Sequence, residues 1–274
     1  MAPRSPSSPP DPTSRRFPWA TFVLLSGVAA VGFGVHSGRL VVPDRFNPWA
    51  PLNVEATPNF LTDFKLSRAR GDPASCLAAL AQTGMAYDLL PDRVTGPGCG
   101  FANAVRLRAA GVRIGPALPL SCPMALSFFM WERHALQPAA KRHFGQRVVA
   151  VEHLGSYACR NVNRGEGSPP EGAQAPNGLR SRHATADALD IAAFTLEGGT
   201  HITVRKDWVN GQTSTPQASE VPGAPGAPGK RQAEMLADAH EGACRFFPGV
   251  LGPDYNTVHR DHFHFETGGY RMCR

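Results

Sequence analysis

Cysteine is absent from the first 75 residues, and nowhere do two cysteines have the Cys-x-x-Cys spacing of a thiolate zinc site. This spacing disfavours a structural zinc site built from cysteine. An even number of cysteines confined to one part of a chain is typical of disulfides formed in an oxidising compartment. Six cysteines allow fifteen pairings. We take the sequential one as the expectation: Cys76–Cys99, Cys122–Cys159 and Cys244–Cys273.

Lysine is also scarce, with four residues against 24 arginines and a net charge of +6. The basic residues are dispersed along the chain, whereas nucleic-acid-binding proteins cluster them on one element or interleave them with aromatic residues. We therefore expect no nucleic-acid partner. A basic surface on an exported protein is expected to meet anionic wall polymers or lipid headgroups instead.

Charge is missing from Phe17 to Val35, which are all apolar or small, and three arginines precede this run. Such a run predicts a membrane-spanning helix over residues 17–36, with residues 1–16 as a cytoplasmic tail. The competing interpretation is a signal peptide cleaved near Gly27-Val28-Ala29. The apolar run continues to His36, which favours a retained anchor. Either interpretation exports the remainder of the chain.

The rest of the chain divides into a spacer and one domain. Residues 37–72 contain Pro43, Pro48, Pro51 and Pro58 and are interpreted as a proline-rich spacer. In the domain, residues 73–274, apolar spacing predicts helices over 74–82, 124–144 (interrupted at Pro138) and 231–247, and strands over 147–152 and 200–205. Inserts fall at 163–177 and at about 210–230, the second of low complexity and expected to be disordered. This pattern predicts a single exported α+β domain with a small antiparallel sheet.

A set of possible metal ligands lies in the second half of the domain. His183 and Asp190 are seven residues apart, and His264 follows about seventy residues later. Two imidazoles and a carboxylate would supply three ligands and leave a fourth position open, which distinguishes a catalytic zinc from a structural one. Ala186, Ala188 and Asp190 alternate as on one face of a strand, and so do His262 and His264. If the two strands are adjacent, Asp190 and His264 meet at one metal and His262 lies in the same cleft.

These residues resemble the zinc peptidases of bacterial peptidoglycan, which include D-alanyl-D-alanine carboxypeptidases, dipeptidases and murein endopeptidases. Their pattern is Ser-x-His-x-x-Gly-x-Ala-x-Asp followed by His-x-His or Glu-x-x-His, and Ala186 stands here in place of the Gly. More narrowly, residues 76–273 resemble the extensin-like C-terminal domain family of Gram-negative bacteria. The segments that carry this resemblance are Cys122-Pro-Met-Ala125, Gly155-Ser-Tyr-Ala-Cys-Arg160, His183 to Asp190, Leu251-Gly-Pro-Asp-Tyr255 and His259 to Glu266. A plant-type structural role does not follow, because Ser-Pro runs are missing beyond Ser8-Pro-Pro10 and Ser168-Pro-Pro170.

The resemblance implies a role for each residue that matches the pattern. His183, Asp190 and His264 would bind zinc, and His262 takes the position of the general base. Arg160 takes the position of an arginine that holds the substrate and the developing oxyanion.

Two further residues lie beside the motifs. His259 is interpreted as a residue behind the ligands that orients one of them, or as a polar residue where a strand begins. Ser181 is interpreted as a cap near the site.

The sequence thus predicts a zinc peptidase of the inner membrane whose domain faces the periplasm. Its substrates would be peptidoglycan peptide stems, cleaved as a D,D- or L,D-peptidase. The alternative is a zinc-bearing domain that binds the wall or supports an envelope complex without cleaving anything, and a third possibility is an exported domain that binds no metal. His262 favours the enzyme, because hydrolysis needs a base and binding does not.

Overall fold

The computed structural model describes residues 19–163, 178–209 and 229–274, and these residues fall into two compact units that divide between residues 47 and 48. The expected cytoplasmic tail, most of the insert at 163–177 and nearly all of the insert at 210–230 lie outside the described residues.

The first unit contains helix α1 (Trp19–His36) and the short 3-10 helix η1 (Asp44–Phe46). The large apolar side chains of α1, among them Phe22, Leu24 and Leu25, are exposed. Among the helices of the described ranges, however, none is both long and apolar enough to cross a membrane. The expected anchor over residues 17–36 is therefore not supported by the structure.

The second unit is built on a sheet in the order β1-β4-β5-β6-β7-β10-β9-β11, with β8 also paired to β7. Its strands are β1 (Ala86–Leu90), β4 (Ala104–Ala109), β5 (Arg113–Ser121), β6 (Val148–Gly155), β7 (Ala188–Leu196), β8 (His201–Thr203), β9 (Gly249–Leu251), β10 (Phe263–Glu266) and β11 (Met272–Cys273). A separate hairpin pairs β2 (Arg93–Gly96) with β3 (Cys99–Phe101). The α+β prediction is confirmed. The sheet is larger than the small antiparallel one expected, and β5–β6 and β9–β11 are parallel pairs.

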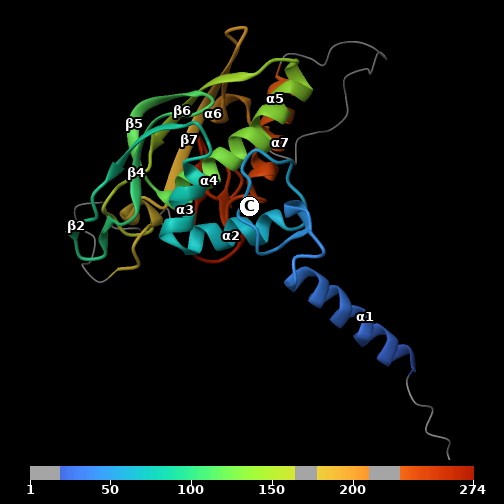
Figure 1. The fold of residues 1–274 in the computed structure, drawn as a ribbon. Coiled ribbons are helices and arrows are strands. Elements are labelled where there is room, and N and C mark those ends of the chain that lie inside the picture. The colour runs from blue at the N-terminus through green and yellow to red at the C-terminus, as the bar shows by residue number, and fades with distance from the viewer. Residues whose placement is uncertain (1–18, 164–177, 210–228) are drawn as a thin grey trace, which may run out of the picture. The chain divides into compact units, whose positions relative to one another are not determined.

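Helices gather on one side of this sheet (Figure 1). They are α2 (Thr62–Gly71), α3 (Pro73–Leu80), α4 (Cys122–Trp131), the π-helical turn η2 (Glu132–Leu136), α5 (Gln137–Phe144), α6 (Val204–Asp207) and α7 (Lys230–Ala243). The side chain of Ser121 caps α4 by accepting from the Met124 N–H. Pro138 follows the π-helical turn η2, which interrupts the regular α-helical hydrogen bonding just before the proline.

The aromatic core joins the helices to the sheet. The Trp131 ring packs 6.2 Å from Phe194 of β7 and 5.1 Å from Phe265 of β10, measured between centroids. Its indole N–H donates to the Ala239 carbonyl at 2.8 Å. The two strands that present Asp190 and His264 are thus fixed from behind by a fully buried tryptophan.

Residues 48–71 correct the expectation of a spacer over 37–72. Leu52, Val54 and Leu66 are buried in the core of the second unit. In α2, the half-buried Arg70 guanidinium donates to the Phe246 carbonyl at 2.7 Å. The prolines interrupt regular structure here without preventing the apolar side chains between them from packing.

The disulfides pair Cys76 with Cys122, Cys99 with Cys159 and Cys244 with Cys273. The third pair is as expected, and the first two expected pairs are wrong. The start of α4 packs against α3 and the 159 segment lies against the β2–β3 hairpin, so spatial neighbours do not follow chain order. None of the six cysteines is free.

Candidate metal site

Asp190 and His264 face each other across two adjacent antiparallel strands. Asp190 belongs to β7 and His264 to β10, and the register places the two residues directly opposite one another. His264 Nδ1 lies 2.8 Å from Asp190 Oδ1. The two strands are thus adjacent, the condition under which Asp190 and His264 were expected to meet.

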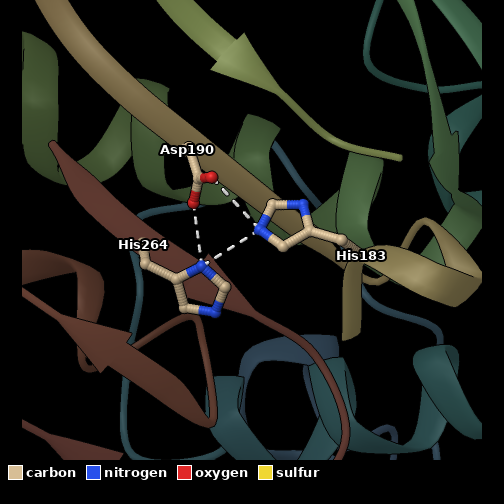
Figure 2. A group of neighbouring side chains, drawn as sticks. All are labelled: His183, Asp190 and His264. Carbon is tan, nitrogen blue, oxygen red and sulfur yellow. Dashed lines mark hydrogen bonds and ion pairs between the residues drawn. The ribbon is translucent and has the colours of Figure 1, made fainter. Parts of the chain in front are cut away.

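His183 reaches the same point from the 3-10 turn η4 (Arg182–Thr185). The Ser181 hydroxyl caps this turn by accepting from the His183 N–H at 3.3 Å, so Ser181 supports the backbone of the turn. His183 Nε2 lies 3.2 Å from Asp190 Oδ2 and 3.3 Å from His264 Nδ1. Figure 2 shows the three side chains converging on one point.

Ala186 ends the η4 turn in the left-handed backbone region, with a φ of 57°. Its N–H donates to the His183 carbonyl at 3.2 Å, and its carbonyl accepts from the Ser121 N–H at 2.9 Å. Glycine adopts this conformation without steric cost and alanine does not. A glycine at this position would therefore relieve the strain in the backbone. The expected strand face from Ala186 is corrected, since β7 begins at Ala188.

The donor set fits a tetrahedral zinc ion. One ligand atom from each of His183, Asp190 and His264 can be chosen so that all lie within 4.8 Å of one another. Ligand atoms about 2.0–2.2 Å from a tetrahedral zinc are about 3.3–3.6 Å apart, close to the 3.2 and 3.3 Å found around His183 Nε2. The 2.8 Å between His264 and Asp190 has the length of a hydrogen bond and would have to widen.

The electrostatics of the site favour a charged carboxylate. Burial by itself would raise the pKa of Asp190, but hydrogen bonds from His183 and His264 outweigh burial and hold that pKa well below its usual value. Burial would likewise lower the pKa of His264, yet its hydrogen bonds to Asp190 and Glu266 raise it to about 9. A metal ion at this site would therefore have to displace a proton from His264, because only a deprotonated ring nitrogen is a ligand.

Glu266 contacts the far side of His264 and was not predicted to belong to the site. Its Oε2 lies 3.2 Å from His264 Nε2, while His264 Nδ1 faces Asp190. A carboxylate on the second ring nitrogen fixes the tautomer and orientation of a metal-binding histidine. Strand alternation could have predicted this contact, because His264 and Glu266 are two residues apart on β10 and their side chains lie on the same face.

His262 lies just before β10, beside the same cluster. Its Nε2 is 3.6 Å from Asp190 Oδ1, and its Nδ1 lies 2.9 Å from the carboxylate of Asp261. With Nδ1–H donating to Asp261, Nε2 carries the lone pair and faces the site. Asp261 was also missed, because a neighbour in sequence reveals nothing about which way two side chains turn.

His259 packs its ring against the site, 5.3 Å from His262 and 5.5 Å from His264 between centroids. The Asn256 side-chain oxygen accepts from His259 Nδ1 at 2.7 Å. Burial is the main cause that lowers the pKa of His259 to about 4, and the charges of His264 and His262 add to it. His259 is therefore a neutral ring behind the cluster, and its described contacts include no direct hydrogen bond to a ligand.

Arg160 lies beside the His183 turn. Its carbonyl accepts from the Ser181 N–H at 3.1 Å, and the Ala158 N–H donates to the His183 carbonyl at 3.1 Å. The guanidinium is close enough that its charge contributes to the lowered pKa of His259. The Cys99–Cys159 disulfide anchors the preceding residue.

These features define an α+β domain with a candidate His–Asp–His metal site. The chain belongs to the family described as extensin-like protein C-terminus, whose model matches residues 74–274. No curated protein and no solved structure matches the chain.

Proposed function

We propose that the protein is a zinc-dependent hydrolase of amide bonds in the peptide stems of peptidoglycan. The observation that carries the proposal is the convergence of His183, Asp190 and His264, with His262 beside them. Two imidazole nitrogens and one carboxylate oxygen are the ligand set of a catalytic zinc site that leaves one position open. The sequence resemblance to wall peptidases supplies the substrate class.

Each residue of the site has a part in this chemistry. Zinc, when bound, lowers the pKa of water to about 7 and polarises a carbonyl. His262 Nε2 faces the cluster. With its lone pair it takes a proton from the attacking water and then gives that proton to the leaving amine. Asp261 holds the ring and stabilises the imidazolium that forms. Arg160 offers positive charge where an oxyanion develops.

The presence of a general base beside the cluster distinguishes a hydrolase from a domain that only binds wall peptides. A domain that only held wall peptides would need the metal or the arginine, but it would not need an oriented Asp261–His262 pair. The pair therefore favours an enzyme over a non-catalytic wall-binding or envelope scaffold domain.

The disulfides support an exported domain. Six cysteines in three pairs suit an oxidising compartment. We infer that the domain faces the periplasm, where peptidoglycan is accessible.

The direct test is incubation of the zinc-loaded protein with purified muropeptides, followed by mass spectrometry. His262→Ala should keep its zinc and its fold but lose turnover by about 100-fold or more. Arg160→Ala should lose about 100- to 1,000-fold, and Arg160→Lys should recover only part of it because an ammonium lacks the planar fork. His201→Ala is the matched control, since His201 is an exposed histidine on β8 paired with Glu152.

The outcomes separate the candidate functions. Stoichiometric zinc without any cleavage by the unmodified protein would favour the binding domain. Zinc retained in full by both His183→Ala and Asp190→Ala would show that the ligands are misassigned.

A further inference from the structure

A cavity of about 500 Å³ lies beside the π-helical turn η2. Its volume falls within the roughly 300–1,000 Å³ of ligand pockets. The segments 55–57, 83–84, 110–111 and 129–137 line it, together with Arg147. Carboxylate, guanidinium, imidazole, amide and hydroxyl groups are all present in this lining, so the cavity suits a polar ligand.

The cavity is distinct from the candidate metal site, and none of the three possible metal ligands lines it. Trp131, the residue before Glu132, packs against Phe265 with 5.1 Å between the ring centroids. Successive side chains of a strand point to opposite faces, so His264 lies on the other face of β10. A ligand in the cavity therefore needs neither the metal nor the proposed hydrolase activity.

The cavity contains a buried carboxylate with one free oxygen. Glu132 is only 4% exposed. The Gln137 side-chain N–H groups donate to Glu132 Oε1 at 2.6 Å and to the Val148 carbonyl at 2.9 Å, and the Val148 N–H donates back to Gln137 Oε1 at 3.0 Å. These bonds fix Gln137 and, through it, Glu132 Oε1. Within the described residues, Glu132 Oε2 accepts no hydrogen bond.

The backbone around Glu132 is shaped to accommodate this carboxylate. Glu132 begins η2, and π-helical turns occur frequently at functional sites. The turn between β4 and β5 lies against the carboxylate, since a Cβ atom at Gly111 would be 3.1 Å from Oε2 and 3.2 Å from Oε1. A side chain at position 111 would crowd both oxygens.

No neighbouring cation in the lining neutralises Glu132. Arg133 forms an ion pair with Glu55, and Arg147 is exposed to solvent. His134 Nε2 donates to a backbone carbonyl at 2.9 Å, and burial lowers the pKa of this histidine. Burial raises the pKa of Glu132 by more than the two arginine charges lower it. A cation in direct contact with Oε2 would therefore stabilise the buried carboxylate.

We propose that this cavity binds a small primary amine whose ammonium group contacts Glu132 Oε2. A guanidinium binds a carboxylate best through two parallel hydrogen bonds, one to each oxygen, but Gln137 already occupies Oε1. An ammonium is a compact charge that needs only one oxygen. The buried Phe129 ring in the lining can contact a short methylene chain.

Calorimetry on the full chain at neutral pH tests this site with three ligands of one chain length. They are n-butylamine, which is protonated, the uncharged n-butanol, and n-butylguanidine. We expect a dissociation constant on the order of 1 mM for the amine, consistent with so small a ligand. The alcohol and the guanidine should bind at least about tenfold more weakly, the lower range for loss of a charged hydrogen bond.

An isosteric variant assigns the contact. Glu132→Gln keeps the volume and an acceptor for Gln137 but removes the charge, so it should weaken amine binding by about tenfold or more. Glu152→Gln is the matched control, because Glu152 is an exposed glutamate outside the cavity. In the unmodified protein, an amine titration followed by NMR should shift the backbone amides of 110–111 and 129–137 and leave those of the metal cluster unchanged.

Several results would overturn the amine site. They are equal affinities for the amine and the alcohol, full amine affinity in Glu132→Gln, shifted amides confined to other parts of the chain, or no amine binding at all. Amine binding by a protein that cleaves no muropeptide would support the site and count against the hydrolase alone.

Discussion

Replacing Glu266 by Gln tests whether His264 is a metal ligand held from behind. The Glu266 carboxylate lies 3.2 Å from His264 Nε2, on the opposite side of the ring from Asp190. Gln keeps the shape and an acceptor oxygen but removes the negative charge. The shape matters, because the Glu266 chain packs against the backbone at Gly249.

The exposure of Glu266 limits the loss of zinc affinity that Glu266→Gln can cause. Loss of such a carboxylate partner costs about 10- to 100-fold in metal affinity, or about 1.4 to 2.7 kcal/mol. The Glu266 side chain is 25% exposed, so solvent screens part of its charge. We therefore expect Glu266→Gln to weaken zinc binding by about tenfold.

Competition with a chromophoric chelator at fixed pH measures this affinity. Glu152→Gln is the matched control, because Glu152 also contacts a histidine, His201 at 2.9 Å, on the exposed surface of the same sheet. The control should bind zinc as the unmodified protein does. An unchanged affinity in Glu266→Gln would refute the assignment of His264 Nε2 as the supported nitrogen.

Three other predictions concern stability, each checked by denaturant unfolding. Burial lowers the pKa of His240 to about 4. As pH falls below about 6.5 the unfolded chain binds the proton first, so up to about 3 kcal/mol of stability present at pH 7 should be lost by pH 4. His240→Leu should reduce this pH dependence, and an unchanged slope would contradict the assignment. Ala186→Gly should leave the protein equally stable or up to about 1 kcal/mol more stable, because it relieves the left-handed strain; a clear loss would mean that the methyl group packs. Replacing Cys76 and Cys122 together by Ala should cost about 4 kcal/mol, because the bond closes a loop of 46 residues. A cost below about 1 kcal/mol would argue against this pairing.

Local patterns predicted the helices well. The apolar spacing of Met124, Phe128 and Trp131 indicated the helix over 124–144, and α4 to α5 occupy 122–144. Where proline and polar residues dominate, the same reasoning failed. Leu66 and Ala69 share one short face of α2, too brief a pattern to outweigh the four prolines before it.

Part of the candidate site could likewise be predicted from local sequence patterns, and part could not. Alternation along single strands indicated that Asp190 and His264 would meet if their strands were adjacent, and the pairing of β7 with β10 supplies that adjacency. The disulfide pairing was not available from the chain, since Cys99 meets Cys159 only after β3 packs beside η4. The contact of Asp261 with His262 was missed for another reason, because it depends on how two neighbouring side chains turn.

Residues 48–71 lie before the segment that the family model matches, yet they pack into the core of the same unit. The family match begins at residue 74, yet Leu66 is fully buried and Arg70 binds the carbonyl of Phe246, far along the chain. A protein cut at the family boundary would expose the apolar face beneath α2 and leave that carbonyl without its cation. We expect a chain starting at residue 48 to be obtained folded and one starting at residue 74 to aggregate. The segment that packs into the core of this unit is therefore longer than the segment that the family model matches.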